Sequence, residues 1–261
     1  MSSCYGKYAS VYDVLYSDKP YKAEAQFIDD CFHGYGDHNI NKILELACGT
    51  GSHSLELEKK GYEIIATDFS EEMIKCAKQK ANIVKSKIDF RCLDMRSVNL
   101  VEHPFDAIIC LFDSIGYINS NEDLNKTFAG ISNYLRTDGL FIFEFWHAAA
   151  MLMHYEPIKT RYQKTECGNV LRISETELDY LNQIASVHYT IYELLNNGTF
   201  SSHSEIHKSR FFLIQEMANF LTKNGLTPIK FFDGFSFNEK ISDNTWHILG
   251  VAQKKSSSTQ V

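Results

Sequence analysis

Apolar runs alternate with amphipathic stretches along the first 147 residues of the chain. Between the runs, apolar residues recur at helical spacing, as in Leu124, Phe128 and Ile131. A run that is nearly all apolar, such as FDAIICLF, is typical of a strand covered on both faces. Strands that alternate with helices predict a parallel sheet with right-handed crossovers. The predicted strands span residues 42–47, 62–68, 87–94, 105–112 and 140–146.

Local signals predict where several of the helices and turns begin. Residues 20–34 have the spacing of a helix that precedes the first strand. Ser70 fits an N-cap, followed by acidic residues in the first helical turn. Ser120 with Asp123 resembles a capping box in which Asp replaces Glu. The segment TDG at 137–139 predicts a turn into the fifth strand.

The pattern changes after residue 147. Residues 155–212 alternate between polar and apolar positions, and NNG at 196–198 is a hairpin turn signal. A helix over 215–224 follows, and two further strands, 227–232 and 246–254, are expected to pair as an edge of the main sheet. We therefore predict an α/β, Rossmann-like fold. It has a mostly parallel seven-stranded sheet, helices on both faces and an antiparallel β insertion.

The net charge and the lengths of the apolar stretches exclude several classes of binding partner and favour one cellular compartment. The formal net charge is -7 over 261 residues, with no run of Lys or Arg, which argues against nucleic acid and anionic membranes as partners. No apolar stretch approaches the ~20 residues that span a bilayer. The first ten residues lack the apolar core of a signal peptide. We expect a soluble, cytoplasmic protein.

The seven cysteines are scattered without a CxxC pair, so we expect neither a metal site nor disulfides.

The first glycine loop predicts a ligand site. The segment ILELACGTGSHS (43–54) runs from a strand through a glycine turn into a helix, which is a place to hold a ligand. A dinucleotide fingerprint would require a third glycine where Ser54 stands, which disfavours a nicotinamide oxidoreductase.

Two acidic positions favour an adenosine at this edge of the sheet. Asp68 ends the second predicted strand, 19 residues after Gly49, where a carboxylate can accept hydrogen bonds from both ribose hydroxyls. Asp94 and Met95 end the third predicted strand beside the same crevice. S-adenosylmethionine fits this arrangement because it has no pyrophosphate to hold. It needs close backbone approach and a helix N-terminus that favours its carboxylate by roughly 0.3–1 kcal/mol.

The segments ELACGTG, ATDFSEEMI and CLDM resemble the nucleotide motifs of class I S-adenosylmethionine-dependent methyltransferases. The resemblance spans residues 5–147 and is closest to the nucleotide-sugar N-methyltransferases, which dimethylate the 3-amino group of deoxysugars in the mycaminose and desosamine pathways. Those enzymes carry VYDxxY, SxGY/H and ExW segments. Here the segments read VYDVLY (11–16), DSIGY (113–117) and EFW (144–146), and HKSRFF (207–212) is similar to their returning strand.

The resemblance implies roles for residues at matching positions. Asp68 would bind the ribose and Asp94 the adenine amino edge. The remaining implied cofactor contacts are Tyr16 and Lys19 near the methionine end, Ala47, Gly49 and Gly51 in the loop, and Met95 and Leu111 beside the adenine. The product would be S-adenosylhomocysteine.

Methyl transfer is an in-line displacement, so the enzyme mainly aligns nucleophile, methyl and sulfur, and an amine must first lose a proton. Tyr117 and Tyr16 are the first candidates to contact the reacting amine, with His147 and His207 as second choices.

The diphosphate of a nucleotide sugar would favour an arginine fork as its binding group. Among the insertion's basic residues, Lys159, Arg161, Arg172, Lys208 and Arg210, we favour Arg172 and Arg210, and Trp146 could stack on a base.

These roles divide the chain into four expected parts. Residues 1–147 hold an N-terminal helix and the cofactor-binding core, and 148–212 form an antiparallel insertion over the substrate. Residues 213–253 complete the core sheet, and 254–261 form a disordered tail.

The expected activity is methylation of the amino group of a nucleotide-linked amino deoxysugar, by a monomer or homodimer. The alternatives are N- or O-methylation of another small metabolite and a non-catalytic cofactor-binding module.

Overall fold

The computed structural model describes residues 8–36 and 40–255. Seven strands form the larger sheet: β1 Lys42–Leu46, β2 Glu63–Asp68, β3 Asp89–Cys92, β4 Phe105–Cys110, β5 Leu135–Trp146, β10 Leu226–Asp233 and β11 His247–Lys254. Their order is β10-β11-β5-β4-β1-β2-β3, and β11 runs antiparallel to both β10 and β5, whereas the other neighbouring pairs are parallel. The predicted mostly parallel α/β sheet is confirmed, including the pairing of the two late strands at its edge.

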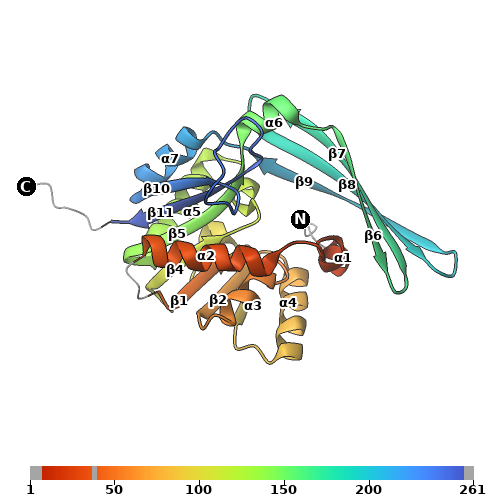
Figure 1. Cartoon of the computed structure of the whole chain (residues 1–261), viewed down its shortest axis with the longest axis horizontal. Coiled ribbons are helices and arrows are strands. Elements are labelled where there is room, and N and C mark those ends of the chain that lie inside the picture. The colour runs from red at the N-terminus through yellow and green to blue at the C-terminus, as the bar shows by residue number, and fades with distance from the viewer. Residues whose placement is uncertain (1–7, 37–39, 256–261) are drawn as a thin grey trace, which may run out of the picture.

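Helices cover both faces of this sheet. The helices are α1 Tyr8–Leu15, α2 Tyr21–Tyr35, α3 Ser52–Glu58, α4 Glu71–Val84, α5 Asn121–Tyr134, α6 Ala148–His154 and α7 Ile214–Lys223, with 3-10 turns η1 Met95–Ser97 and η2 Ser114–Tyr117. Side chains of α2, α3 and α4 form one buried cluster with the sheet, and those of α5 and α7 form another. Figure 1 shows α2 and α3 on the near side of the sheet.

The period of two along each strand explains both clusters. Ile43 of β1 packs with the α2 side, whereas its neighbour Leu44 packs with the α5 side. In β5, Ile142 faces the first cluster and Phe143 the second. A strand buried on both faces needs apolar residues at successive positions, which is why the central strands read as continuous apolar runs.

A second sheet has four antiparallel strands in the order β6-β7-β8-β9. They are β6 Ile158–Thr165, β7 Gly168–Asp179, β8 Ile184–Leu195 and β9 Phe200–Arg210. The NNG segment turns β8 into β9, where the Leu195 amide donates to the Thr199 carbonyl at 2.9 Å. The expected alternation over 155–212 therefore does form an antiparallel sheet, which follows α6 along the chain (Figure 1).

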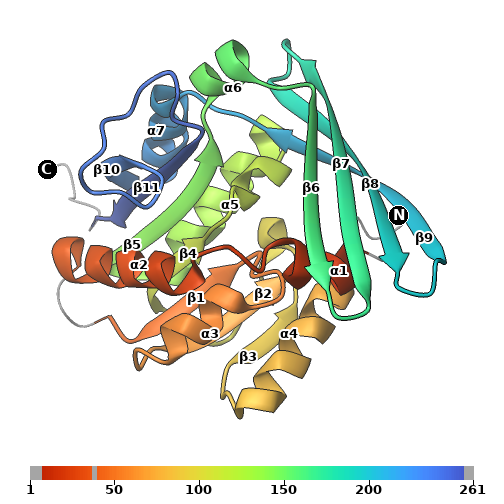
Figure 2. The same cartoon turned by 45° about the vertical axis from the view of Figure 1, so that its right-hand side comes forward.

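Helix α1 connects the two sheets. Buried side chains of α1, including Val11 and Leu15, form a cluster with Met73 of α4 and with Val170 and Ile191 of the second sheet. In Figure 2, α1 lies between the β1–β2 region and the lower ends of β6 and β7. The second sheet is thus held beside the end of the main sheet where β1 and β2 end.

Two predicted boundaries are wrong for local reasons. TDG lies inside β5, where Asp138 has φ 62° and the register with β4 jumps between the pairs Phe105–Leu135 and Ala107–Leu140. The segment is a bulge, not a turn before the strand. The fourth strand ends at Cys110, because Phe112 and Asp113 adopt φ 56° and 58° and leave the sheet.

The C-terminal end agrees with the predicted strand over 246–254. Lys254, which was also expected as the first residue of the tail, belongs to β11 and pairs with Leu226. Residues 256–261 lie outside the described residues, as do residues 1–7.

Gly51 is required for packing as well as for its backbone conformation. It has φ 76°, and a Cβ there would lie 2.6 Å from Phe90. Gly49 has φ 57° with nothing within 4 Å of a Cβ. We expect Gly49→Ala to reduce the free energy of unfolding by about 1–2 kcal/mol through strain alone, and Gly51→Ala by about 1–3 kcal/mol more through overpacking. Urea denaturation measures both, and equal losses would contradict the Phe90 contact.

Candidate active site

A cavity of about 760 Å³ lies where the carboxyl ends of the core strands face the second sheet. Its core side includes residues that follow β1, β2, β3 and β4. Its other side includes residues of β6 to β9 and of α1. A parallel sheet collects the loops after its strands at one edge, so segments far apart in sequence meet there. Of the predicted site residues, the lining includes Tyr16, Ala47, Gly49, Asp68, Asp94, Met95, Leu111, Tyr117, Trp146, Arg172 and His207.

The glycine loop is joined to the end of β2. The amide of Gly49 donates a hydrogen bond to Asp68 Oδ2 at 2.8 Å. Ala47 has φ 53°, a left-handed conformation that is uncommon for a non-glycine residue. Open space on the Cβ side of Gly49 allows a ligand to approach the backbone. Gly51 is absent from the cavity lining, because it packs on Phe90 at the start of α3.

Asp68 is a buried carboxylate at the cavity wall. Its second oxygen accepts from the Ser70 amide at 2.8 Å. Burial raises the pKa of Asp68, although the amides of Ser70 and Gly49 oppose the rise. A carboxylate has about four acceptor positions, so two remain for a ligand with hydroxyl groups.

Asp94 and Met95 are close to the Asp68 side of the cavity, and Leu111 lines it as well. The Asp94 carboxylate caps η1 by accepting from the Arg96 amide at 2.9 Å and also pairs with the Arg96 guanidinium at 2.5 Å. Arg96 also lines the cavity, and no sequence pattern identified it as a candidate.

Tyr16 and Lys19 occupy different environments. The Tyr16 hydroxyl accepts from Arg172 Nη1 at 2.7 Å, so α1 and β7 meet at the cavity. Lys19 is absent from the lining. Its ammonium pairs with Glu24 at 2.5 Å and lies 4.4 Å from the centroid of the Phe112 ring.

Two of the catalytic candidates are in direct contact. The Tyr117 hydroxyl and His207 Nδ1 are 2.9 Å apart, and His207 Nε2 is 3.3 Å from Glu205 Oε2. His207 is buried in β9, and both rings line the cavity. His147 is not brought to this group. It is buried at the start of α6, with Nδ1 3.1 Å from the Thr245 carbonyl.

Of the two favoured arginines, one lines the cavity and the other does not. Arg172 lines the cavity, with its guanidinium carbon 4.6 Å from the centroid of the Tyr189 ring. Arg210 points away from it, since its guanidinium bonds Asn121 at 2.7 Å and Glu216 at 2.6 Å. Lys159 and Arg161 of β6 line the cavity together with Arg172, and Arg161 is paired across the strands with Arg172.

Glu45 is a lining residue that sequence reasoning missed. It is buried, the Ser54 hydroxyl donates to it, and burial raises its pKa from 4.5 to about 8. A raised pKa means that the folded chain holds a proton that the unfolded chain has lost, so stability falls as pH rises from about 4.5 to about 8. One pKa unit corresponds to about 1.4 kcal/mol.

We therefore expect Glu45→Gln, which keeps an acceptor for Ser54 without a charge, to lose less stability than the native chain over this pH range. Urea denaturation at pH 5 and pH 8.5 measures the difference between the two proteins. Parallel losses in native and variant chains would show that Glu45 does not carry this pH dependence.

Comparisons with known proteins match one family across the core of the chain. Residues 43–139 match a family described as a methyltransferase domain. YqeM of Bacillus subtilis (strain 168), whose name assigns it provisionally to the methyltransferases, is 30% identical over 221 residues, which is 85% of each chain. A solved S-adenosylmethionine-dependent methyltransferase from Clostridium acetobutylicum is 26% identical with a TM-score of 0.81, covering 97% of this chain and 100% of that one.

Two further relatives have named substrates. A glycine/sarcosine N-methyltransferase of Aphanothece halophytica is 29% identical over 55% of this chain and 54% of its own length. A dTDP-3-amino-3,4,6-trideoxy-alpha-D-glucopyranose N,N-dimethyltransferase of Streptomyces venezuelae is 29% identical over 53% of this chain and 57% of its own length. In the described part of the chain, no helix has the length and apolar character needed to cross a membrane.

Proposed function

The chain belongs to the class I S-adenosylmethionine-dependent methyltransferases, and from that premise we propose that its acceptor is the amino group of a nucleotide-linked amino deoxysugar, with dTDP as the expected nucleotide. Its cofactor is S-adenosylmethionine. The observation that carries the proposal is the group of three cationic side chains on the second-sheet side of the cavity, Lys159, Arg161 and Arg172. They lie where an acceptor would enter and suit a diphosphate.

The core side of the cavity fits the cofactor. We assign the ribose hydroxyls to Asp68, whose carboxylate retains acceptor positions after bonding Gly49 and Ser70. Met95 and Leu111 offer apolar surface for the adenine, with Asp94 at its edge. The backbone of Ala47 and Gly49, together with Tyr16, is assigned to the methionine end. When bound, S-adenosylmethionine supplies a methyl group on a positively charged sulfonium.

The residues around Tyr117 suit deprotonation of an amine. An ammonium has no free lone pair, so a proton must leave before the nitrogen can attack. The Tyr117 hydroxyl lines the cavity and contacts His207, whose other nitrogen faces Glu205. We propose that Tyr117 orients the amine, and that His207 receives its proton through the Tyr117 hydroxyl while Glu205 stabilises the imidazolium.

The cationic side of the cavity suits an anionic acceptor. Arg161 Nε and Arg172 Nε are buried without a hydrogen-bond partner among the described residues. Buried donors left unpaired are costly, so an added acceptor group at either position would be stabilising. Trp246 and Tyr155 also line the cavity and offer aromatic surface for a nucleobase.

A second candidate is methylation of a small amino acid, because a glycine/sarcosine N-methyltransferase matches half of the chain. Thermal denaturation of the S-adenosylhomocysteine-saturated protein separates the two. A ligand at 100 times its Kd stabilises by about 2.7 kcal/mol. We expect a dTDP-linked 3-amino sugar to raise Tm, and mass spectrometry to detect its methylation with S-adenosylmethionine present.

Matched variants test the cationic group. Arg161→Met should weaken binding of the dTDP sugar, while Lys164→Met, an exposed position at the opposite parity of the same strand, should not. Stabilisation by glycine or sarcosine, with none by the dTDP sugar, would replace the proposal with the second candidate.

A further inference from the structure

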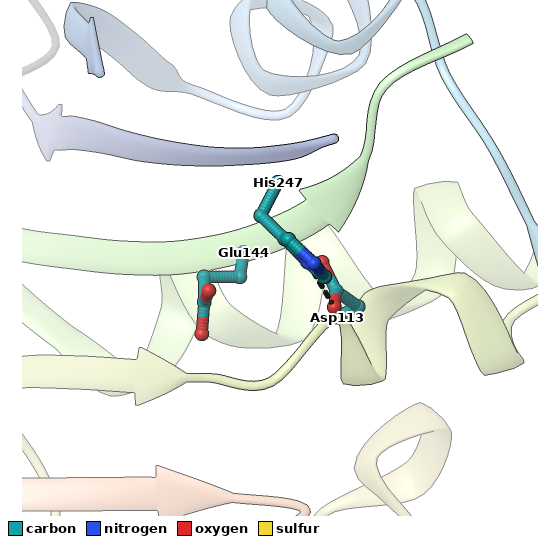
Figure 3. A group of neighbouring side chains, drawn as sticks. All are labelled: Asp113, Glu144 and His247. Carbon is teal, nitrogen blue, oxygen red and sulfur yellow. Dashed lines mark hydrogen bonds and ion pairs between the residues drawn. The ribbon is translucent and has the colours of Figure 1, made fainter. Parts of the chain in front are cut away.

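Three side chains from separate elements converge at the edge of the cavity. Asp113 follows β4, Glu144 lies in β5 and His247 begins β11. One ligand atom from each lies within 4.8 Å of the other two. Figure 3 shows the His247 ring meeting the Asp113 carboxylate, with the Glu144 carboxylate to one side of this pair. Asp113 and His247 also line the cavity.

Asp113 carries an oxygen that the described protein atoms do not satisfy. Its side chain is 7% exposed, and Oδ2 lies 2.7 Å from His247 Nδ1. Oδ1 is buried and has no hydrogen-bond partner among the described residues. An unpaired carboxylate oxygen in a buried place is costly, so this atom points to a ligand beyond the protein.

Glu144 adds a second buried carboxylate. It is 3% exposed, and one of its oxygens accepts from the Phe112 amide at 2.5 Å. Phe112 and Asp113, which follow β4, both hold left-handed backbone conformations. Two carboxylates in one buried place repel each other, and a bound cation removes that repulsion.

We propose that Asp113, Glu144 and His247 bind one divalent transition-metal ion. Two carboxylates and an imidazole suit Mn²⁺ or Zn²⁺ better than Mg²⁺, which prefers oxygen ligands alone. The ion binds at the place where Asp113 Oδ2 and His247 Nδ1 now lie 2.7 Å apart. Three protein ligands leave further coordination positions, and the cavity is where they open.

The ion has a use in the proposed reaction. If the acceptor is an amino sugar, as proposed above, an open coordination position can hold a sugar hydroxyl beside the reacting amine. A metal ion that orients an acceptor lowers the barrier by positioning. This use rests on the proposed function, whereas the site itself rests only on the three residues.

The test is metal binding by the full chain without cofactor or acceptor. EDTA-stripped protein is titrated with Mn²⁺, followed by electron paramagnetic resonance, and with Zn²⁺, followed by calorimetry. We expect one ion per chain. Asp113→Asn, Glu144→Gln and His247→Gln should each weaken binding at least about tenfold. The half-exposed His247 side chain makes H247Q the variant that keeps the fold when a buried change does not.

The control is another acid–histidine pair. Asp243 lies 3.8 Å from His154 on the surface, so Asp243→Asn should leave metal affinity unchanged. A native chain that binds neither ion stoichiometrically overturns the proposal, and so does equal affinity in native and H247Q chains. Because cofactor and acceptor are absent, this result is independent of the nucleotide-sugar test.

Discussion

Asp68→Ala is expected to weaken binding of S-adenosylhomocysteine by at least about a hundredfold. Hydrogen bonds to a charged group contribute about 1.5–3 kcal/mol each, and the proposal gives Asp68 two ribose hydroxyls. Each 1.4 kcal/mol is about tenfold in affinity. The same carboxylate accepts from the Gly49 and Ser70 amides, so its loss also frees the glycine loop. Isothermal titration calorimetry measures the affinity.

A matched carboxylate separates the two effects. Asp106 accepts from the Asn41 amide at 3.0 Å and the Lys42 amide at 2.8 Å, where β1 and β4 begin, at the end of the sheet opposite to the cavity. Asp106→Ala should therefore lower stability but keep cofactor affinity. Asp68→Asn should lose less affinity than Asp68→Ala, because its amide oxygen still accepts. An Asp68→Ala chain that folds and binds as tightly as the native one would remove the ribose assignment.

Tyr117→Phe is expected to lower kcat by about a hundredfold, the low end of what a positioned acid–base group contributes. The change removes the hydroxyl that lies 2.9 Å from His207 and leaves the aromatic ring in place. Cofactor affinity should stay at the native value, because Tyr117 is not assigned to cofactor binding. Steady-state kinetics with the accepted amine and calorimetry with S-adenosylhomocysteine give the two readouts.

Tyr62→Phe is the control for this change. The Tyr62 hydroxyl bonds Asp29 beside the start of β2, and Tyr62 is absent from the cavity lining. The native kcat is expected there. His207→Gln should reproduce much of the Tyr117→Phe loss, since the two groups form one path for the proton. A Tyr117→Phe enzyme with native kcat would leave Tyr117 a packing role alone.

The core of the fold was predictable because strands that are buried on both faces have apolar residues at nearly every position. The apolar runs gave the five strands, and glycines at 49 and 51 placed the loop between β1 and α3. Loop chemistry was less predictable. The sequence DSIGY does not reveal that Asp113 has φ 58° or that its carboxylate lies close to Glu144 and His247. Those three residues lie on elements whose adjacency follows from the strand order.

Strand parity explains the other differences. His207 lines the cavity from β9, whereas Arg210, three residues later, has the opposite parity and bonds Glu216. Lys159 and Arg161 share a parity in β6 and line the cavity, although the favoured residues did not include them. Alternation in a sequence shows that two faces exist. Which face meets the cavity depends on how the second sheet is placed, and that is fixed by contacts with α1.

The placement of the second sheet has a consequence for how acceptor choice can change. The cationic lining residues Lys159, Arg161 and Arg172 come from β6 and β7, whose sheet shares no strand with the seven-stranded sheet. Cavity-facing positions of those strands can therefore mutate without disturbing the interior that fixes Asp68 and the glycine loop. Such an arrangement lets one methyl-transferring framework be redirected to new metabolites by changes at a few cavity-facing side chains of the second sheet.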